Sequence, residues 1–304
     1  AKIAMDGRDA EKIRTVYDPA CGSGSLLLKF KRELGKNSKG LRFIGQEINL
    51  TTYNLCRMNM MLHGVPVDEF SIAHGDTLID PKHRNGKNPK FVEPFGAIVS
   101  NPPYSTKWKG DDDPTLKHDD RYAPASVLAP KSKADLAFTM HMLKSLDEAG
   151  TAAIVEFPGV LYRGGAERKI REYLLIENRV DAVIQLPANL FYGTSIATCI
   201  LVLKKGRRKD HSVLFVDASQ LFDKGKNQNI LGQSHREKIL EVLATREERE
   251  HFSALVPVQK LLEQEANLAV SSWVEPEDTR ERVDIVELNS RIEGIVARQA
   301  QLRV

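Results

Sequence analysis

Asn101, Pro102, Pro103 and Tyr104 form the segment with the clearest chemical meaning. They directly follow an apolar run at residues 96–100, so we expect them at the end of a strand. An amino group conjugated to a purine ring is a poor nucleophile because its lone pair is delocalised. The Asn101 side-chain oxygen and the Pro102 carbonyl can accept hydrogen bonds from that group and free its lone pair, with the prolines holding both acceptors in place. The competing interpretation is an ordinary turn, since Asn-Pro often starts turns.

Aromatic residues near this motif can hold the ring that carries the amino group. Tyr104 offers a flat face, and stacking of a base on an aromatic side chain contributes about 1–3 kcal/mol. Phe191 or Tyr192, which follow a later predicted strand, would form the opposite wall of the pocket. The competing interpretation of those two is an ordinary buried aromatic in a loop. Trp108 and its flanking lysines directly follow the motif and are candidates for contacting a nucleic-acid strand.

A glycine-rich turn after the first predicted strand is the second candidate site. Residues 16–25 read Val-Tyr-Asp-Pro-Ala-Cys-Gly-Ser-Gly-Ser, and the glycines let the backbone approach a ligand closely. A P-loop would end in Gly-Lys-Ser/Thr, and a dinucleotide fingerprint would need glycine in place of Leu27. An acidic residue at position 18 would repel a pyrophosphate but suits the amino group of S-adenosylmethionine. We therefore predict an S-adenosylmethionine site that contains Asp18, Ala20, Gly22, Ser23, Gly24 and Ser25.

Two further acidic residues end the next two predicted strands. Glu47 is placed to accept hydrogen bonds from the ribose hydroxyls of the cofactor. Its competing role is a cap for the helix that starts near Asn49. Asp76 is placed to accept from the adenine amino group of the cofactor, while its neighbour Thr77 can equally be a turn cap. Asn101 completes this set, because the reacting group must lie beside the cofactor.

The elements that must position these residues alternate between strand and helix. Strands are predicted at residues 15–18, 41–46, 70–74, 96–100, 151–157, 180–186, 197–203 and 213–216, and helices at 25–34, 50–63, 134–147 and 167–177. This alternation predicts an α/β fold with a doubly wound, mostly parallel sheet. Together with the site predicted above, it resembles the seven-stranded, Rossmann-like sheet of S-adenosylmethionine-dependent methyltransferases. The strand, turn, strand pattern at residues 196–216 predicts an antiparallel strand near one end of the sheet.

After residue 232 the alternation of predicted strands and helices gives way to charged segments with helical spacing. We predict a catalytic domain at residues 1–232 and a helical C-terminal extension at 233–304, with apolar residues at helical spacing in 283–303. That apolar stripe either binds a partner or packs back on the domain. Residues 105–130 are a long polar stretch without predicted elements, and loops of such length are usually functional or disordered.

Composition sets broad limits on the class of protein. No run of about 18 apolar residues predicts a membrane span, and residues 1–14 do not read as a signal peptide. Three widely spaced cysteines give no metal-binding or redox pair, so we expect a cytoplasmic protein and no metal site. The net charge is only +3, which is compatible with nucleic acid but predicts that a partner supplies much of any DNA affinity.

Together these motifs resemble one family. The segments at 18–25, 101–104, 129–138, 158–167, 189–196 and 274–278 are similar to the modification (M) subunit of type I restriction-modification systems, which methylate N6 of adenine in DNA. The resemblance implies S-adenosylmethionine as cofactor and catalysis at Asn101, Pro102 and Tyr104 on an adenine flipped out of the duplex, which costs a few kcal/mol. It also implies DNA, a specificity (S) subunit, a restriction (R) subunit and a second M subunit as partners. The family's N-terminal helical domain and Phe-x-Thr-Pro motif are missing here, so we expect a truncated chain.

Other interpretations of the motifs remain open. Enzymes that methylate protein glutamine or guanine in RNA also use Asn-Pro-Pro-Tyr, although they lack the long following loop and the helical tail. A cofactor-binding scaffold subunit is the alternative without enzymatic activity, and it predicts decay of the Asn101–Tyr104 motif, which is intact. A nicotinamide-dependent dehydrogenase is excluded by the glycine pattern.

Overall fold

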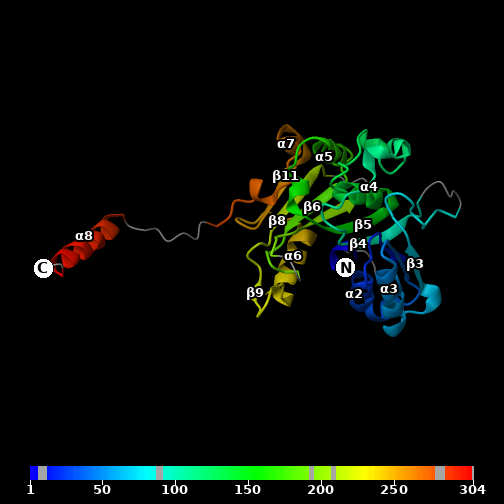
Figure 1. The fold of residues 1–304 in the computed structure, drawn as a ribbon, viewed down its shortest axis with the longest axis horizontal. Helices are drawn as coiled ribbons and strands as arrows, with labels where there is room; N and C mark the ends of the chain where they lie inside the picture. Colours follow the sequence, from blue (N-terminus) through cyan, green and yellow to red (C-terminus); the bar gives the residue numbers. More distant parts are fainter. Residues whose placement is uncertain (6–11, 87–91, 192–194, 207–209, 278–284, 303–304) are drawn as a thin grey trace.

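One large sheet forms the centre of the protein. The computed structural model describes residues 1–5, 12–86, 92–191, 195–206, 210–277 and 285–302. Within these residues the main sheet has nine strands in the order β11-β8-β6-β7-β5-β4-β1-β2-β3 (Figure 1). The strands are β1 (Thr15–Asp18), β2 (Arg42–Glu47), β3 (Phe70–His74), β4 (Phe95–Ser100), β5 (Leu146–Glu156), β6 (Val180–Gln185), β7 (Cys199–Lys204), β8 (Ser212–Asp217) and β11 (Ser253–Pro257). A separate hairpin joins β9 (Asp223–Lys224) to β10 (Asn229–Ile230).

Helices cover both faces of the sheet. They are α1 (Lys2–Met5), α2 (Ser25–Leu34), α3 (Leu50–Leu62), α4 (Asp135–Ser145), α5 (Ala166–Ile176), α6 (Gln233–Thr245) and α7 (Val258–Glu263). A further helix, α8 (Ile285–Gln301), does not cover the sheet. Successive side chains of a strand point to opposite faces, so Val16 belongs to the core under α1, α2 and α3, and Tyr17 to the core under α4, α5 and α7. This two-sided burial explains the almost continuous apolar runs of the central strands. The predicted doubly wound, mostly parallel α/β fold is confirmed, but the sheet has nine strands in the described chain and not the predicted seven.

Of the predicted pair of strands at 196–216, the antiparallel one, β7 (Cys199–Lys204), lies inside the sheet. β7 pairs antiparallel with both β5 and β6, whereas β8 pairs parallel with β6. The prediction of an antiparallel strand near one end of the sheet was therefore wrong in its position. The turn between β7 and β8 does not make a hairpin of the two strands, because β6 lies between them.

The elements after residue 232 differ from a purely helical extension. Ile239 and Val242 of α6 are buried against the sheet in one core cluster with Ala182, Leu214 and Val216. β11 then extends the sheet by pairing antiparallel with β8. α6 and β11 pack on the main sheet because the apolar side chains of α6 are buried there and the backbone groups of β11 pair with β8. The predicted boundary at 232 thus falls inside the packed body.

None of the described side chains of α8 lies in the core. Figure 1 shows this helix away from the sheet, and Leu288 and Ile292 on its apolar stripe are 45% and 49% exposed. Among the described residues, no helix combines the length and apolar character that a bilayer span requires.

The strand order reverses between β1 and β4. From β1 the chain builds outward through β2 to β3, and then it returns to β4 on the other side of β1. In sheets of this kind a ligand binds outside the carboxyl ends of the strands at such a switch point. Asp18 and Ser100 end the two strands that flank this point.

We expect Gly24→Ala to destabilise the fold more than Gly22→Ala. Both residues have positive φ, of 82° and 53°, so both variants strain the backbone. A Cβ on Gly24 would lie 2.7 Å from Met60 Cε and 2.8 Å from Cys56 Sγ, whereas Gly22 has open space. Overpacking should lower the free energy of unfolding by about 1–3 kcal/mol beyond the Gly22 variant. Urea unfolding measures both, and equal losses would contradict the close packing at Gly24.

Candidate active site

The glycine-rich turn connects β1 to α2 and rests on the end of β2. Gly24 adopts the left-handed conformation and precedes Ser25, the first residue of α2. The Cys21 amide donates to the Gln46 carbonyl at 3.0 Å, and the Asn59 side-chain amide donates to the Ser23 carbonyl at 2.9 Å. The turn is therefore held on both sides, by β2 and by α3.

Asp18 lies under this turn. Its Oδ1 accepts hydrogen bonds from the Ser100 hydroxyl at 2.7 Å and the Ala20 amide at 3.1 Å. Burial raises the pKa of Asp18 to about 7, against the lowering effect of these two hydrogen bonds. Asp18 at the end of β1 thus contacts Ser100, which directly precedes Asn101. The glycine-rich turn and the Asn-Pro-Pro-Tyr motif therefore lie next to each other.

Glu47 ties the end of β2 to the glycine-rich turn. Its Oε2 accepts from the Gly22 amide at 2.9 Å, and its Oε1 accepts from the Asn49 amide at 2.8 Å. The helix cap itself is Asn49, whose Oδ1 accepts from the Thr52 amide. The competing interpretation of Glu47 as the cap of α3 was therefore wrong. A carboxylate oxygen can accept more than one hydrogen bond, so Glu47 keeps capacity for ligand hydroxyls.

The third acidic residue lies beyond β3. Asp76 Oδ1 accepts from the Leu78 amide at 2.9 Å and stabilises its own turn. The Thr77 hydroxyl donates to the Pro19 carbonyl at 2.6 Å, so it bonds to the glycine-rich segment instead of capping a turn. Asp18 ends β1, Glu47 ends β2 and Asp76 follows β3. These three strands are parallel neighbours, so their carboxyl ends lie at the same edge of the sheet.

The Asn-Pro-Pro-Tyr motif leaves β4 directly beside Asp18. Asn101 is exposed and Pro102 is buried. The Tyr104 hydroxyl donates to Asn101 Oδ1 at 2.5 Å, a contact that the sequence does not predict. Burial raises the pKa of Tyr104 to about 12, so the phenol keeps its proton. This bond orients the carboxamide, and the second lone pair of its oxygen stays available for an amino group.

The predicted second wall of the pocket is only partly described. Phe191 is half-buried in the loop after β6, and Tyr192 lies outside the described residues. Asn229 supports this loop, because its amide donates to the Asn189 carbonyl and its side chain to the Ala188 carbonyl. The ring contacts of the described residues include no pair between Phe191 and Tyr104, so the pocket wall stays a prediction.

The long polar segment 105–130 folds over the site edge. It forms short 3-10 helices at Gly110–Asp112, Pro114–His118 and Ala123–Ala125. Arg121 is buried and donates to the carbonyls of Thr77 and Leu78 at 2.8 and 2.9 Å, with Asp119 as its ion-pair partner at 2.7 Å. A buried arginine that binds backbone carbonyls gives no recognisable local sequence pattern, which is why this anchor was missed.

Trp108 is part of the core and not of a surface. It is buried, its ring contacts Tyr122 edge-on at 5.4 Å, and its amide donates to the Lys131 carbonyl. Its predicted contact with nucleic acid is therefore wrong.

Ile48 is a further residue that the sequence analysis overlooked. It directly follows Glu47 and is 63% exposed at the carboxyl end of β2. An exposed apolar side chain next to Glu47 offers a surface for a flat ring. Its signal in the sequence is an apolar residue next to the acidic residue that ends the second strand.

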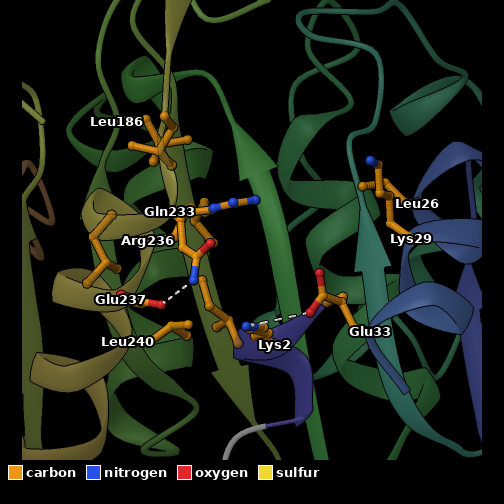
Figure 2. A pocket seen from close by; sticks show the side chains of 14 residues that line it. Lys2, Leu26, Lys29, Glu33, Leu186, Gln233, Arg236, Glu237 and Leu240 are labelled. Atoms are coloured by element: carbon orange, nitrogen blue, oxygen red, sulfur yellow. Dashed lines mark hydrogen bonds and ion pairs between the residues drawn. The ribbon is translucent and has the colours of Figure 1, made fainter. Parts of the chain in front are cut away.

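A cavity of about 480 Å³ lies elsewhere, between α1, α2 and α6 (Figure 2). Lys2 pairs with Glu33 across it at 3.6 Å, and Gln233 donates to Glu237 at 2.8 Å. Its lining residues include none of the Asn101–Tyr104 motif and none of the three acidic residues. The cavity is therefore separate from the Asn101–Tyr104 motif and from the three acidic residues.

The fold and the strand-end residues define a class. A sheet ordered β3-β2-β1-β4-β5-β7-β6 with antiparallel β7 and a glycine-rich turn after β1 is the fold of the S-adenosylmethionine-dependent methyltransferases. The chain belongs to the N-6 DNA methylase family, whose sequence model matches residues 1–282.

Relatives and solved structures agree with this family. The chain is 47% identical over 305 residues to the type I restriction enzyme MpnII methylase subunit of Mycoplasma pneumoniae, and 31% identical over 294 residues to the MjaVII methylase subunit of Methanocaldococcus jannaschii. These matches cover 100% and 93% of this chain but 56% and 49% of the relatives, so the chain spans about half their length. The crystal structure of a type I methyltransferase subunit from Streptococcus thermophilus superposes with a TM-score of 0.83 at 43% identity, covering 90% of this chain and 57% of that one. The resemblance to type I modification subunits is thereby confirmed.

We expect the affinity for S-adenosylmethionine to rise as the pH increases through about 7. The pKa of Asp18 is raised to about 7, so the carboxylate that can pair with an ammonium group forms only above that pH. Asp18→Asn should remove this pH dependence and weaken binding about tenfold or more, because a charge-assisted hydrogen bond is lost. Glu47→Ala should weaken binding at every pH.

Calorimetric titration across this pH range measures these affinities. Asp68→Asn, which changes an exposed aspartate before β3, is the matched control and should bind like the unchanged chain. A pH-independent affinity of the unchanged chain, or unaltered binding by both site variants, would contradict the assignment.

Proposed function

We propose that this chain transfers the methyl group of S-adenosylmethionine to N6 of adenine in DNA, as the modification subunit of a type I restriction-modification complex. The observation that carries the proposal is the Ser100–Asp18 hydrogen bond at the switch point of the sheet. It places the acceptors of the Asn-Pro-Pro-Tyr motif next to the cofactor turn. The family and the type I relatives support the substrate.

The residues at the carboxyl edge suit this cofactor. Asp18, Glu47 and Asp76 bring three carboxyl groups to the strand ends, which disfavours a phosphate-bearing ligand and favours one with an amino group and free ribose hydroxyls. Glu47 would hold the ribose, Asp76 the adenine amino group and Asp18 the ammonium group. Ile48 would contact the adenine ring. When bound, S-adenosylmethionine supplies a methyl group made electrophilic by its sulfonium.

Asn101 and Pro102 prepare the target amino group. The Asn101 side-chain oxygen and the Pro102 carbonyl would accept hydrogen bonds from the two N–H groups of the adenine amino group. These bonds would draw its nitrogen toward a tetrahedral geometry, so that the lone pair becomes available. Because Tyr104 already binds Asn101 Oδ1, the acceptor needs little reorientation when a base arrives. Tyr104 would also provide a stacking face for the adenine, with Phe191 or Tyr192 as the other wall.

Partners would supply what this chain lacks. Its net charge of +3 predicts limited DNA affinity of its own, so an S subunit would read the sequence, and an R subunit and a second M subunit would complete the complex. The exposed apolar stripe of α8 is a candidate docking surface for such a subunit, because amphipathic helices bury their stripe against a partner. The alternatives, protein glutamine and RNA, are not favoured by the relatives.

We expect Asn101→Ala to reduce methylation by about 100-fold or more, since loss of one preorganised hydrogen-bonding group in an active site has that order of effect. Cofactor binding should stay within about twofold, because Asp18, Glu47 and Asp76 are unchanged. Transfer of labelled methyl groups to DNA by the assembled enzyme measures the first, and titration calorimetry the second. Asn37→Ala, at an exposed position after α2, is the control. Retained methylation by the Asn101 variant would overturn its assigned role.

We also expect Leu288→Glu and Ile292→Glu to prevent assembly with a partner subunit. Each places a charge in the apolar stripe of α8, whereas Ser290→Glu adds the same charge to the opposite side of the helix. Copurification with the S subunit should fail for the first two variants and succeed for the third. Assembly of all three would show that the stripe does not form the interface.

A further inference from the structure

Two buried carboxyl groups lie beneath the catalytic motif and have no role in the function proposed above. Asp135, in the first turn of α4, is 1% exposed, and Glu156, at the end of β5, is 0% exposed. Asp135 Oδ1 accepts from the Ser105 amide at 2.9 Å, directly after Tyr104. Glu156 Oε1 accepts from the Thr139 hydroxyl at 2.9 Å. Asp135 therefore contacts the loop that carries Asn101, and Glu156 contacts α4 one turn after Asp135.

The remaining oxygen of each group lacks a partner. Asp135 Oδ2 and Glu156 Oε2 are buried and accept no hydrogen bond from the described residues. A buried carboxylate oxygen without a partner is costly, and two carboxylates side by side repel each other. A proton on one carboxyl group would remove both problems at once, because the resulting hydroxyl can donate to the other group.

We infer that Asp135 and Glu156 form a buried acid pair that holds one proton and fixes the Asn101–Ser105 loop in its reactive position. The role in catalysis rests on the function proposed above, whereas the pair itself does not. The proton belongs to Glu156, because the helix dipole favours a negative charge at Asp135 in the first turn of α4. Glu156 Oε2 then donates to Asp135 Oδ2, and Asp135 holds the Ser105 amide.

The electrostatics of the surroundings agree with this assignment. Burial raises the pKa of Glu156 well above its ordinary value, and the Asp135 carboxylate and Glu167 raise it further, against a hydrogen bond from Thr139. Around Glu156, α4 contributes Asp135, α5 contributes Glu167, the catalytic loop contributes Tyr104, and β7 contributes Cys199. The nearby cations Arg163 and Lys133 act on Glu167.

The pair has a defined effect on the catalytic loop. Ser105 has a φ of 51°, which is an unfavourable backbone conformation for a residue other than glycine. The hydrogen bond to Asp135 stabilises this conformation and so sets the direction of Tyr104, which in turn orients Asn101. Asp135 and Glu156 contact neither substrate nor cofactor in this scheme and are positioning residues.

Stability as a function of pH tests the shared proton. Folding raises the pKa of Glu156 above the value of about 4.5 that it has in the unfolded chain. The protonated group contributes its full stabilisation below that unfolded value. The contribution is lost as the pH rises toward the pKa in the folded protein. Glu156→Gln keeps an oxygen for Thr139 and a permanent N–H donor for Asp135. The unfolding equilibrium constant of the unchanged chain, relative to this variant, should therefore increase about tenfold per pH unit above about pH 5.

Urea unfolding of the full chain between about pH 5.5 and about pH 8 gives this ratio. Glu148→Gln, which changes an exposed glutamate of the same strand, is the matched control and should show no such trend. A ratio that does not change with pH would show that Glu156 is ionised and would overturn the pair. This result does not depend on whether the chain methylates DNA.

Methylation by the assembled enzyme tests the positioning role. Asp135→Ala removes the acceptor for Ser105 and should lower kcat about tenfold or more, with KM for S-adenosylmethionine within about twofold. Asp135→Asn keeps an acceptor for Ser105 and a donor for Glu156, so it should restore most of kcat. Equal loss in the Ala and Asn variants, or an unchanged kcat in the Ala variant, would refute the positioning role. If the unchanged enzyme modifies no adenine, the proposed function fails, while the stability result still stands.

Discussion

The hydrogen bond from Ser100 to Asp18 is the contact on which the site depends. It crosses from β4 to β1 at the point where the strand order reverses, and its two residues are 82 positions apart in the chain. Both strands lie inside the sheet, so neither end can move without breaking backbone pairing on both sides. The glycine-rich turn and the Asn-Pro-Pro-Tyr motif are therefore held at a constant separation. This arrangement buries Asp18, and the burial raises the pKa of its carboxyl group to about 7.

The irregular segments of the site are held by side chains that bind backbone groups. Glu47 binds the Gly22 amide, Thr77 binds the Pro19 carbonyl, Arg121 binds the Thr77 carbonyl and Asp135 binds the Ser105 amide. Each of these bonds replaces a partner that regular secondary structure would have supplied. Loops held in this way can present acceptors without rearrangement, which is what electrostatic preorganisation requires.

Charge is distributed unevenly between the edge of the sheet and the region behind the catalytic motif. At the edge, Glu47 and Asp76 are partly exposed, whereas Asp18 is buried. Behind the motif, Glu156 is fully buried and no cation of the described residues forms a hydrogen bond with it, so its neutral form is favoured. Burial therefore raises the pKa of both Asp18 and Glu156.

Parts of the fold followed from local patterns. Eight of the strands in the described chain lie where apolar and β-branched runs predicted them, and the helices between them match their apolar spacing. β11 was missed because residues 253–257 are a short edge strand, which takes its partner β8 from a distant part of the chain. The segment 105–130 was left unassigned because its order comes from Arg121 and Tyr122 reaching Leu78 and not from any periodic pattern.

The sequence by itself determined the class of the fold and the positions of the glycine-rich turn and the Asn101–Tyr104 motif. It could do so because strand and helix periodicity, glycine requirements and prolines act over a few neighbouring residues. Only the tertiary structure decided the place of β7, the partner of each carboxylate oxygen, the bond from Tyr104 to Asn101 and the raised pKa values of Asp18 and Glu156. These features depend on burial and on contacts between residues far apart in the chain, and local patterns hold no information about either.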